Sequence, residues 1–103
     1  MPVDELKARM DEGARLQVID VRRAPEFRAG HVPTAEYVHL GDLEAERDGL
    51  DRSRPAVVIC GSGYRSSAGA SLLERGGFAD LYNVVGGTAA WLNAGYPTDQ
   101  EPS

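Results

Sequence analysis

The chain has 103 residues, a length that predicts a single domain with one modest hydrophobic core. Hydrophobic residues make up 42% and charged residues 26%, which is the balance of a globular protein rather than a disordered one. A formal charge of −5 argues against nucleic acid as the main partner, and the chain lacks the long apolar run that a membrane span requires.

The N-terminus and the single cysteine bear on location and metal binding. The first ten residues include acids and lack an apolar stretch, so we do not expect a secretory signal. Cys60 is the only cysteine and has no disulfide partner within the chain, which favours the reducing cytoplasm. His31, His39 and Cys60 follow no metal-ligand spacing, so we expect no metal.

The first half of the chain alternates between helix-like and strand-like segments, the pattern of a parallel sheet covered by helices. A helix is expected first, because Val3, Leu6 and Met10 lie on one apolar stripe and Gly13 can end it. It is followed by a strand at 16–21, a short helix at 25–29, a weaker strand at 36–40 and a short helix at 42–47.

The second half continues this alternation around a β-branched run at 56–59, which predicts a central buried strand. The elements expected after it are a helix at 66–75, a strand at 81–85 and a last helix at 88–94. Gly86-Gly87 predicts a close backbone approach behind the loop that follows the central strand. The polar residues 98–103 are expected to form a flexible tail, which places the core of the domain at about 3–97.

Cys60 follows the predicted central strand directly, at the end of the sheet where ligands bind in open α/β folds. Gly61 and Gly63 permit positive φ angles that turn backbone N–H groups inward, and a helix opening near Ser66 adds further unpaired N–H groups. Such surroundings lower the pKa of a thiol from about 8.5 to roughly 3.5–7.5. We therefore expect Cys60 to be a thiolate nucleophile at neutral pH.

The alternative for Cys60 is a buried structural cysteine, which is the usual state of a lone cysteine. The strand–Cys–Gly-x-Gly–helix context favours a functional cysteine over a structural one. Arg65 is open to a second interpretation as a solvated residue at a helix start, and Arg22 as a partner in a surface salt bridge.

Three motifs, in this order and spacing, resemble the rhodanese-homology domain from about Val3 to Pro97. The first comprises 19–22, 26–27 and 30–33; the second is the loop that begins at Cys60; the third comprises 81–87, 90–91 and 94–97. The resemblance implies an α/β, rhodanese-like fold of about five mostly parallel strands with helices on both faces.

The length of the loop separates two chemistries within this family. Its sulfurtransferases have a six-residue loop that starts at the cysteine, whereas the related cell-cycle phosphatases have seven residues to surround a phosphate. The loop here runs from Cys60 to Arg65 and has the shorter length, which disfavours a phosphatase. A non-catalytic binding or regulatory module is the other alternative, and the intact Cys60 loop argues against it.

The resemblance implies a sulfurtransferase that carries sulfane sulfur as a persulfide on Cys60 and needs no cofactor. The residues expected to form the cradle around the sulfur are Gly61, Ser62, Gly63, Tyr64, Arg65 and Ser66. The residues expected to support this loop from behind are Asp20, Arg22 and Glu26, and Arg22 or Arg65 is expected to pair with an acid.

The partners implied are a small sulfur donor, either thiosulfate or a low-molecular-weight persulfide, and a thiol or cyanide acceptor. A sulfur-accepting protein is a further candidate, whereas nucleic acid and membranes are not expected. The loop also resembles rhodanese domains that are joined to metallo-β-lactamase-like persulfide dioxygenases, so both a free-standing protein and part of such a fusion remain open.

A few residues depart from the family pattern or have two interpretations. Thr34 and His39 stand where glycine and proline are common, and Gly61 replaces the arginine or other bulkier residue of many sulfurtransferases. Tyr64 is expected either to contact a donor or partner or to be an ordinary surface residue, and His31 is expected to be structural rather than a base. The residues expected in the core are Phe27, Leu72, Leu73, Phe78 and Trp91.

Overall fold

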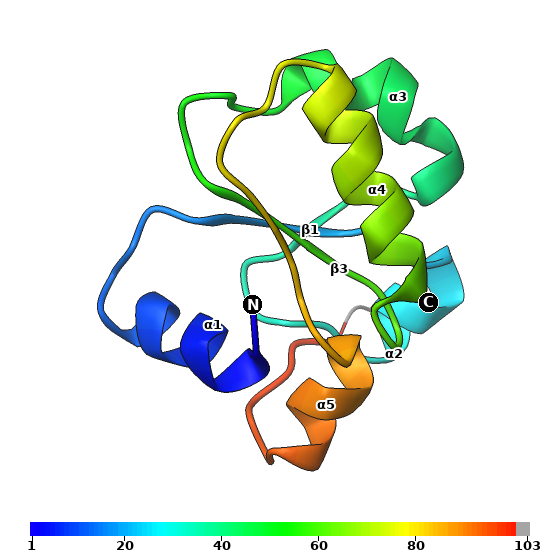
Figure 1. The fold of residues 1–103 in the computed structure, drawn as a ribbon. Helices are drawn as coiled ribbons and strands as arrows, with labels where there is room; N and C mark the ends of the chain where they lie inside the picture. The colour runs from blue at the N-terminus through cyan, green and yellow to red at the C-terminus, as the bar shows by residue number, and fades with distance from the viewer. Residues whose placement is uncertain (101–103) are drawn as a thin grey trace.

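The computed structural model describes residues 1–100, which form a layered α/β fold (Figure 1). The strands are β1 (Gln17–Asp20), β2 (Glu36–Tyr37), β3 (Ala56–Ile59) and β4 (Leu81–Asn83). The helices are α1 (Val3–Asp11), α2 (Ala24–Ala29), α3 (Leu43–Glu46), α4 (Tyr64–Arg75) and α5 (Gly87–Asn93). Two single 3₁₀ turns, Leu40–Asp42 and Arg47–Gly49, flank α3.

The strands form one parallel sheet in the order β2-β1-β3-β4. Every residue of β1 and β3 is buried, as expected for the two central strands of a parallel sheet covered on both faces. Asp20 pairs with Ile59 at the carboxyl end of these strands. The register therefore brings the residues after Asp20 and the residues after Ile59 to the same edge of the sheet.

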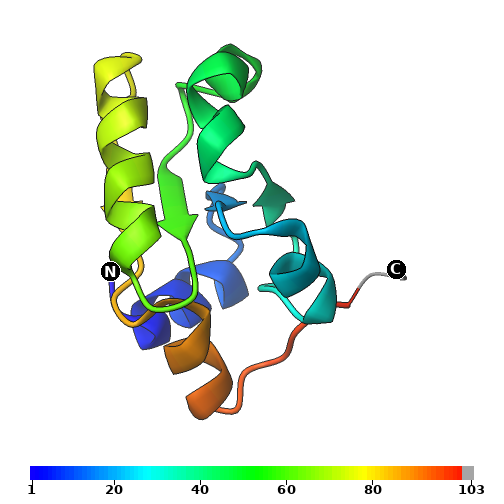
Figure 2. The ribbon, with the colours of Figure 1, turned by 90° about the vertical axis from the view of Figure 1, so that its right-hand side faces the viewer.

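Side chains on the two faces of the sheet form two apolar clusters. One contains Val58, Leu73 and Phe78 and lies under α3 and α4; the other contains Leu6, Val57 and Trp91 and lies under α1 and α5. Figures 1 and 2 show these helix pairs on opposite sides of the sheet, and α2 beyond the end where β1 finishes. The layered fold is thus the one expected, with helices on both faces.

The residues expected in the core lie there, and the stripe of the first helix faces inward. Phe27, Leu73, Phe78 and Trp91 are all buried, and Leu72 is half-buried. Leu6 is fully buried in α1, with Val3 and Met10 packed against the same cluster.

The sheet has four strands in the described residues rather than about five. Beside β4 lies only Met1, whose amino group donates to the carbonyl of Asn83 at 2.7 Å and whose carbonyl accepts from the N–H of Val85 at 2.9 Å. One residue supplies too few ladder hydrogen bonds to make a strand. The edge strand β2 is also shorter than expected, because the chain turns into the 3₁₀ turn at Leu40.

Backbone pairing continues beyond the expected boundary of the core at Pro97. Asp99 forms an antiparallel bridge with His31, with N···O distances of 3.0 and 2.9 Å. The indole N–H of Trp91 donates to the carbonyl of Pro97 at 2.7 Å, which holds this segment against α5. Residue 99 of the expected tail is therefore held in place, and residues 101–103 of that tail lie outside the described residues.

Candidate active site

Cys60 lies where the central strand β3 ends and is fully buried. Only three residues separate Cys60 from α4, since α4 begins at Tyr64 instead of near Ser66 as expected. The early start follows from Gly63, which precedes the helix with a left-handed φ of +100°. The sulfur of Cys60 is therefore enclosed by a short, tightly turned loop.

The sulfur of Cys60 is surrounded by hydrogen-bonding groups of this loop. The N–H of Gly63 donates to Sγ at 3.1 Å, and the hydroxyl oxygen of Ser66 lies 3.4 Å from Sγ. Burial raises the pKa of the Cys60 thiol, but hydrogen bonds from Ser66 and from the backbone of Ser62 and Gly63 outweigh it, so that the pKa is lowered. The loop thus stabilises negative charge on the sulfur.

The two loop glycines have different roles. Gly63 has the positive φ that was expected for both glycines, but Gly61 does not, so that prediction was wrong for Gly61. A Cβ on Gly61 would lie 3.0 Å from Nη2 of Arg65, so glycine there leaves room for the arginine. Gly61 is required for space and Gly63 for backbone conformation.

The loop is held from behind by the start of α5. The N–H of Thr88 donates to the carbonyl of Cys60 at 2.8 Å, and the N–H of Ala89 donates to the carbonyl of Gly61 at 3.0 Å. A Cβ on Gly87 would lie 2.4 Å from the carbonyl oxygen of Cys60, which no side chain can accommodate. The close approach predicted from Gly86-Gly87 is confirmed.

Arg65 pairs with Glu26 and fixes the start of α4 to α2. Nη1 and Nη2 of Arg65 donate to the two carboxylate oxygens of Glu26 at 2.8 and 2.9 Å. These hydrogen bonds lower the pKa of Glu26 to about 2, and they are the main reason that the pKa of Arg65 is raised. The expected pairing is present, and it directs the guanidinium toward Glu26.

Asp20 and Arg22 form a second, buried pair. Nε and Nη2 of Arg22 donate to the Asp20 carboxylate at 2.9–3.1 Å, and Nη2 also donates to the carbonyl of Gly30 at 2.8 Å. Arg22 was expected to pair with an acid, and it does, but its contacts fix the end of β1 and the end of α2 rather than the Cys60 loop.

Asn83 is a polar neighbour of the site that the sequence did not single out. Its Oδ1 accepts a short hydrogen bond from the hydroxyl of Ser66, and its Nδ2 donates to the hydroxyl of Ser67 at 3.0 Å. Nδ2 also lies 3.4 Å from the carbonyl of Gly63. Asn83 therefore orients the hydroxyl that lies beside Sγ. Its position after two apolar residues of a strand resembles an ordinary strand end, and only the β3–β4 pairing reveals the contact.

The remaining candidates lie away from the sulfur. Tyr64 is 88% exposed, and its side chain extends into solvent at the first turn of α4. His31 is buried, stacks on Phe27 with a centroid distance of 3.8 Å, and bonds through Nδ1 to the carbonyl of Phe27. These contacts give His31 the structural role that was expected.

Two further findings concern metal binding and membrane spanning in the described part of the chain. Within residues 1–100, no three His, Cys, Asp or Glu side chains gather as they would around a metal ion. In the same residues, no helix is long and apolar enough to cross a bilayer.

Comparison with known proteins identifies the family to which this fold and this cysteine loop belong. The model of the rhodanese-like domain matches residues 2–94. The chain therefore belongs to the rhodanese-like domain family.

Similar proteins include thiosulfate sulfurtransferases and a rhodanese-related structure. The chain is 35% identical over 98 residues to the thiosulfate sulfurtransferase GlpE of Pseudomonas putida, covering 95% of this chain and 86% of that protein. It is 30% identical over 89 residues to YrkF of Bacillus subtilis, but spans only about half of that protein (48%). A rhodanese-related protein of Thermoplasma volcanium superposes with a TM-score of 0.89 at 27% identity, covering 98% of this chain and 97% of that one.

Proposed function

We propose that the protein is a rhodanese-type sulfurtransferase that carries sulfane sulfur as a persulfide on Cys60. The observation that carries the proposal is the sulfur environment: Gly63 N–H donates to Sγ at 3.1 Å, and the pKa of Cys60 is lowered despite its burial. A thiolate held in this way is a nucleophile that needs no separate base. The thiosulfate sulfurtransferase named among the similar proteins supports the same activity.

The reaction proceeds by two displacements. The Cys60 thiolate attacks the outer sulfur of thiosulfate; the sulfur–sulfur bond of thiosulfate breaks, sulfite leaves with the bonding pair, and Cys60 holds S–S⁻. A thiolate or cyanide then attacks the terminal sulfur, and Cys60 leaves as the thiolate. Both steps conserve charge and need no external oxidant or reductant.

The residues around Cys60 act on the charge that remains on sulfur throughout this cycle. The backbone N–H groups of Ser62, Gly63 and Ser66 are placed to hydrogen-bond an anionic sulfur. Gly61 leaves room for the side chain of Arg65, the Arg65–Glu26 pair fixes the helix that follows, and Asp20–Arg22 supports the adjacent strand end. The short connection to α4 suits a single added sulfur atom better than a tetrahedral phosphate.

The test is direct observation of the intermediate. Incubation with thiosulfate, followed by desalting and intact-mass spectrometry, should show the added mass of one sulfur atom that cyanide removes. Cys60→Ser should fold with an unchanged circular dichroism spectrum, gain no mass and transfer no sulfur to cyanide. A folded Cys60→Ser protein that retains turnover, or a wild-type protein that never forms the adduct with any sulfane donor, would contradict the proposal.

A further inference from the structure

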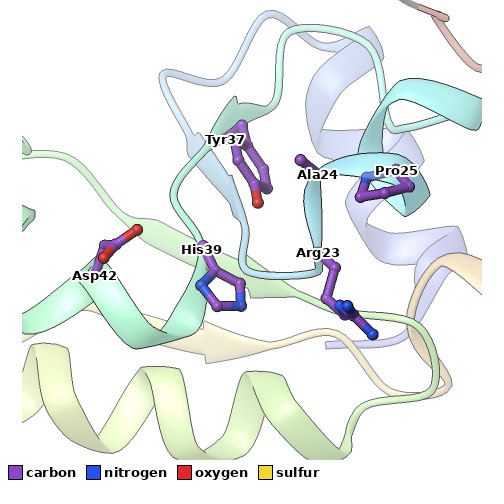
Figure 3. Close-up of a pocket in the computed structure, with 6 residues that line it drawn as sticks. All are labelled: Arg23, Ala24, Pro25, Tyr37, His39 and Asp42. Carbon is purple, nitrogen blue, oxygen red and sulfur yellow. The ribbon is translucent and has the colours of Figure 1, made fainter. Parts of the chain in front are cut away.

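A second polar site lies at the carboxyl edge of the sheet, where the chain leaves β1 and β2. It is a pocket of about 280 Å³, smaller than the pockets that hold whole drug-sized ligands. Figure 3 shows the residues that line it: Arg23, Ala24, Pro25, Tyr37, His39 and Asp42. None of the polar side chains in this set belongs to the cradle around Cys60.

Hydrogen-bond donors converge on one side of this pocket. Among the described residues, Arg23 forms no ion pair, whereas Arg22 and Arg65 are both committed to carboxylates. In Figure 3 the hydroxyl of Tyr37 points into the space between His39 and the side chain of Arg23. Burial raises the pKa of Tyr37, so its hydroxyl stays protonated and can donate to an anion. A guanidinium, a phenol and an imidazole together suit a carboxylate.

The negative charge in the pocket lies apart from these donors. Asp42 stands on the opposite side of His39 from Arg23 (Figure 3). Its carboxylate repels an anion that approaches His39 from that side. An anionic group should therefore bind on the Arg23 side, which is also the side nearer α2.

The pocket and Cys60 lie on the same edge of the sheet. Backbone hydrogen bonds connect Leu40 to Val21, and Val21 to Ile59, so His39 and Cys60 follow strands separated by two strand spacings. At about 4.8 Å per spacing, the two chain positions lie roughly 10 Å apart. A thiosulfate ion is too short to span this distance, whereas an extended peptide of three residues reaches about 10 Å.

Glu26 connects the two sites. Its Oε1 accepts from the backbone N–H of Arg23 at 3.3 Å and from Nη1 of Arg65 at 2.8 Å. A Cβ on Gly61 would lie 3.8 Å from Oε2 of the same carboxylate. The Arg65–Glu26 pair therefore fills the space beside Gly61 and lies between the pocket and the Cys60 loop.

We propose that the pocket binds a carboxylate of a peptide-sized thiol, which uses its sulfur to accept the terminal sulfur from Cys60. This proposal rests on the sulfurtransferase function. The thiolate of the acceptor attacks the terminal sulfur of Cys60–S–S⁻; the sulfur–sulfur bond to Cys60 breaks, Cys60 leaves as the thiolate, and the acceptor departs as its persulfide. Arg23 and Tyr37 hold the carboxylate, so they set specificity for the acceptor and take no part in the bond changes.

The experiment measures sulfite release from thiosulfate with three acceptors: glutathione, glutathione diethyl ester and cyanide. Arg23→Gln should raise the KM for glutathione about tenfold, the loss expected for one charge-assisted hydrogen bond. It should leave the KM for the ester and for cyanide within twofold. Tyr37→Phe should raise the KM for glutathione about threefold and act only on that acceptor.

Arg75→Gln is the matched control, because it removes the same charge from the exposed far end of α4, which does not line the pocket. An equal rise in KM for Arg75→Gln would assign the effect to overall charge and overturn the inference. Failure of the wild type to use glutathione while it uses cyanide, or equal use of glutathione and its ester, would also overturn it. Absence of transfer to every acceptor would instead contradict the sulfurtransferase function itself.

Discussion

Two regions at the carboxyl edge of the sheet are each held by an arginine–carboxylate pair, and the pairs differ in kind. The scaffold region, from the end of β1 to the start of β2, contains Asp20–Arg22, which is almost completely buried. The loop region, from Cys60 to Ser66, is held by Glu26–Arg65, in which each side chain is about a third exposed (36% and 34%).

The difference indicates how the protein divides stability from reactivity. A buried pair cannot lose one member without leaving an unpaired charge in a low-dielectric interior, so its loss affects the whole fold. A pair at the surface contributes little to the free energy of unfolding, because water and salt screen it. The Glu26–Arg65 pair instead fixes the position of the first turn of α4 relative to α2. It therefore also fixes the positions of the N–H groups around the sulfur of Cys60.

The largest expected effect comes from breaking the buried pair. Arg22→Met should lower the free energy of unfolding by about 3–5 kcal/mol, since Asp20 would stay buried without its partner and Gly30 would lose a hydrogen bond. Urea denaturation monitored by circular dichroism measures this. The double variant Asp20→Leu/Arg22→Met should recover part of the loss, because both charges are then gone. A single variant no less stable than the wild type would show that the pair is not a structural requirement.

Breaking the exposed Glu26–Arg65 pair should reduce activity more than stability. Arg65→Gln should change the free energy of unfolding by less than about 1 kcal/mol. Sulfur transfer to cyanide should nevertheless fall by about 10- to 100-fold, because a small displacement of α4 misplaces the hydrogen bonds around the sulfur. The pH dependence of iodoacetamide alkylation should report a higher pKa for Cys60 than in the wild type. Arg75→Gln, at the exposed far end of α4, is the control for charge alone. Unchanged transfer and an unchanged thiol pKa in Arg65→Gln would remove the pair from the mechanism.

The sequence predicted the parts of these regions that depend on local pattern. Short motifs in the sequence predict the buried strand β3, Cys60 after it, the left-handed Gly63 and the close approach at Gly87. The early start of α4 was missed, because the left-handed Gly63, and not the helix propensity of the residues after it, decides the boundary.

Features that depend on the alignment of distant segments were less accessible from the sequence. Asn83 reaches Ser66 only because β3 and β4 pair in the observed register. The pocket of Arg23, Tyr37 and His39 requires α2 to lie beside the end of β2. Pairing with an acid could be expected for both Arg22 and Arg65. The partner of Arg65, however, is Glu26, which lies 39 positions away in the chain and is brought to it only by the fold.

Acid should remove the contribution of the Glu26–Arg65 pair to stability. The pKa of Glu26 is about 2 in the folded protein, below the value of about 4.3 for an unperturbed glutamate. Its stabilising contribution is therefore complete above about pH 5 and is lost as the pH falls toward 2. The difference in free energy of unfolding between the wild type and Glu26→Gln should be at most about 1 kcal/mol at pH 6 and should vanish near pH 2. A difference that grows with acid would give the shift the wrong sign.

The smallest expected effect lies in the scaffold region, at Thr34, and its sign is the reverse of the others. The N–H of Ala35 donates to the carbonyl of Val32 at 3.1 Å, which closes a turn with Pro33 and Thr34 at its centre. Thr34 has a φ of +70°, the only non-glycine residue with positive φ among residues 1–100, in the position where this type of turn favours glycine. A β-branched residue there costs about 1–2 kcal/mol of stability. Glycine removes this cost, but its greater entropy in the unfolded chain offsets part of the improvement.

Thr34→Gly should therefore raise the free energy of unfolding by about 0.5–1 kcal/mol, whereas Thr34→Ala, which keeps a Cβ, should not. Sulfur transfer by Thr34→Gly should stay at the wild-type rate, because the turn belongs to the scaffold region and not to the Cys60 loop. Reduced stability in Thr34→Gly would mean that the threonine side chain contributes more to this turn than its backbone strain removes, and reduced transfer at unchanged stability would show that the two regions are coupled.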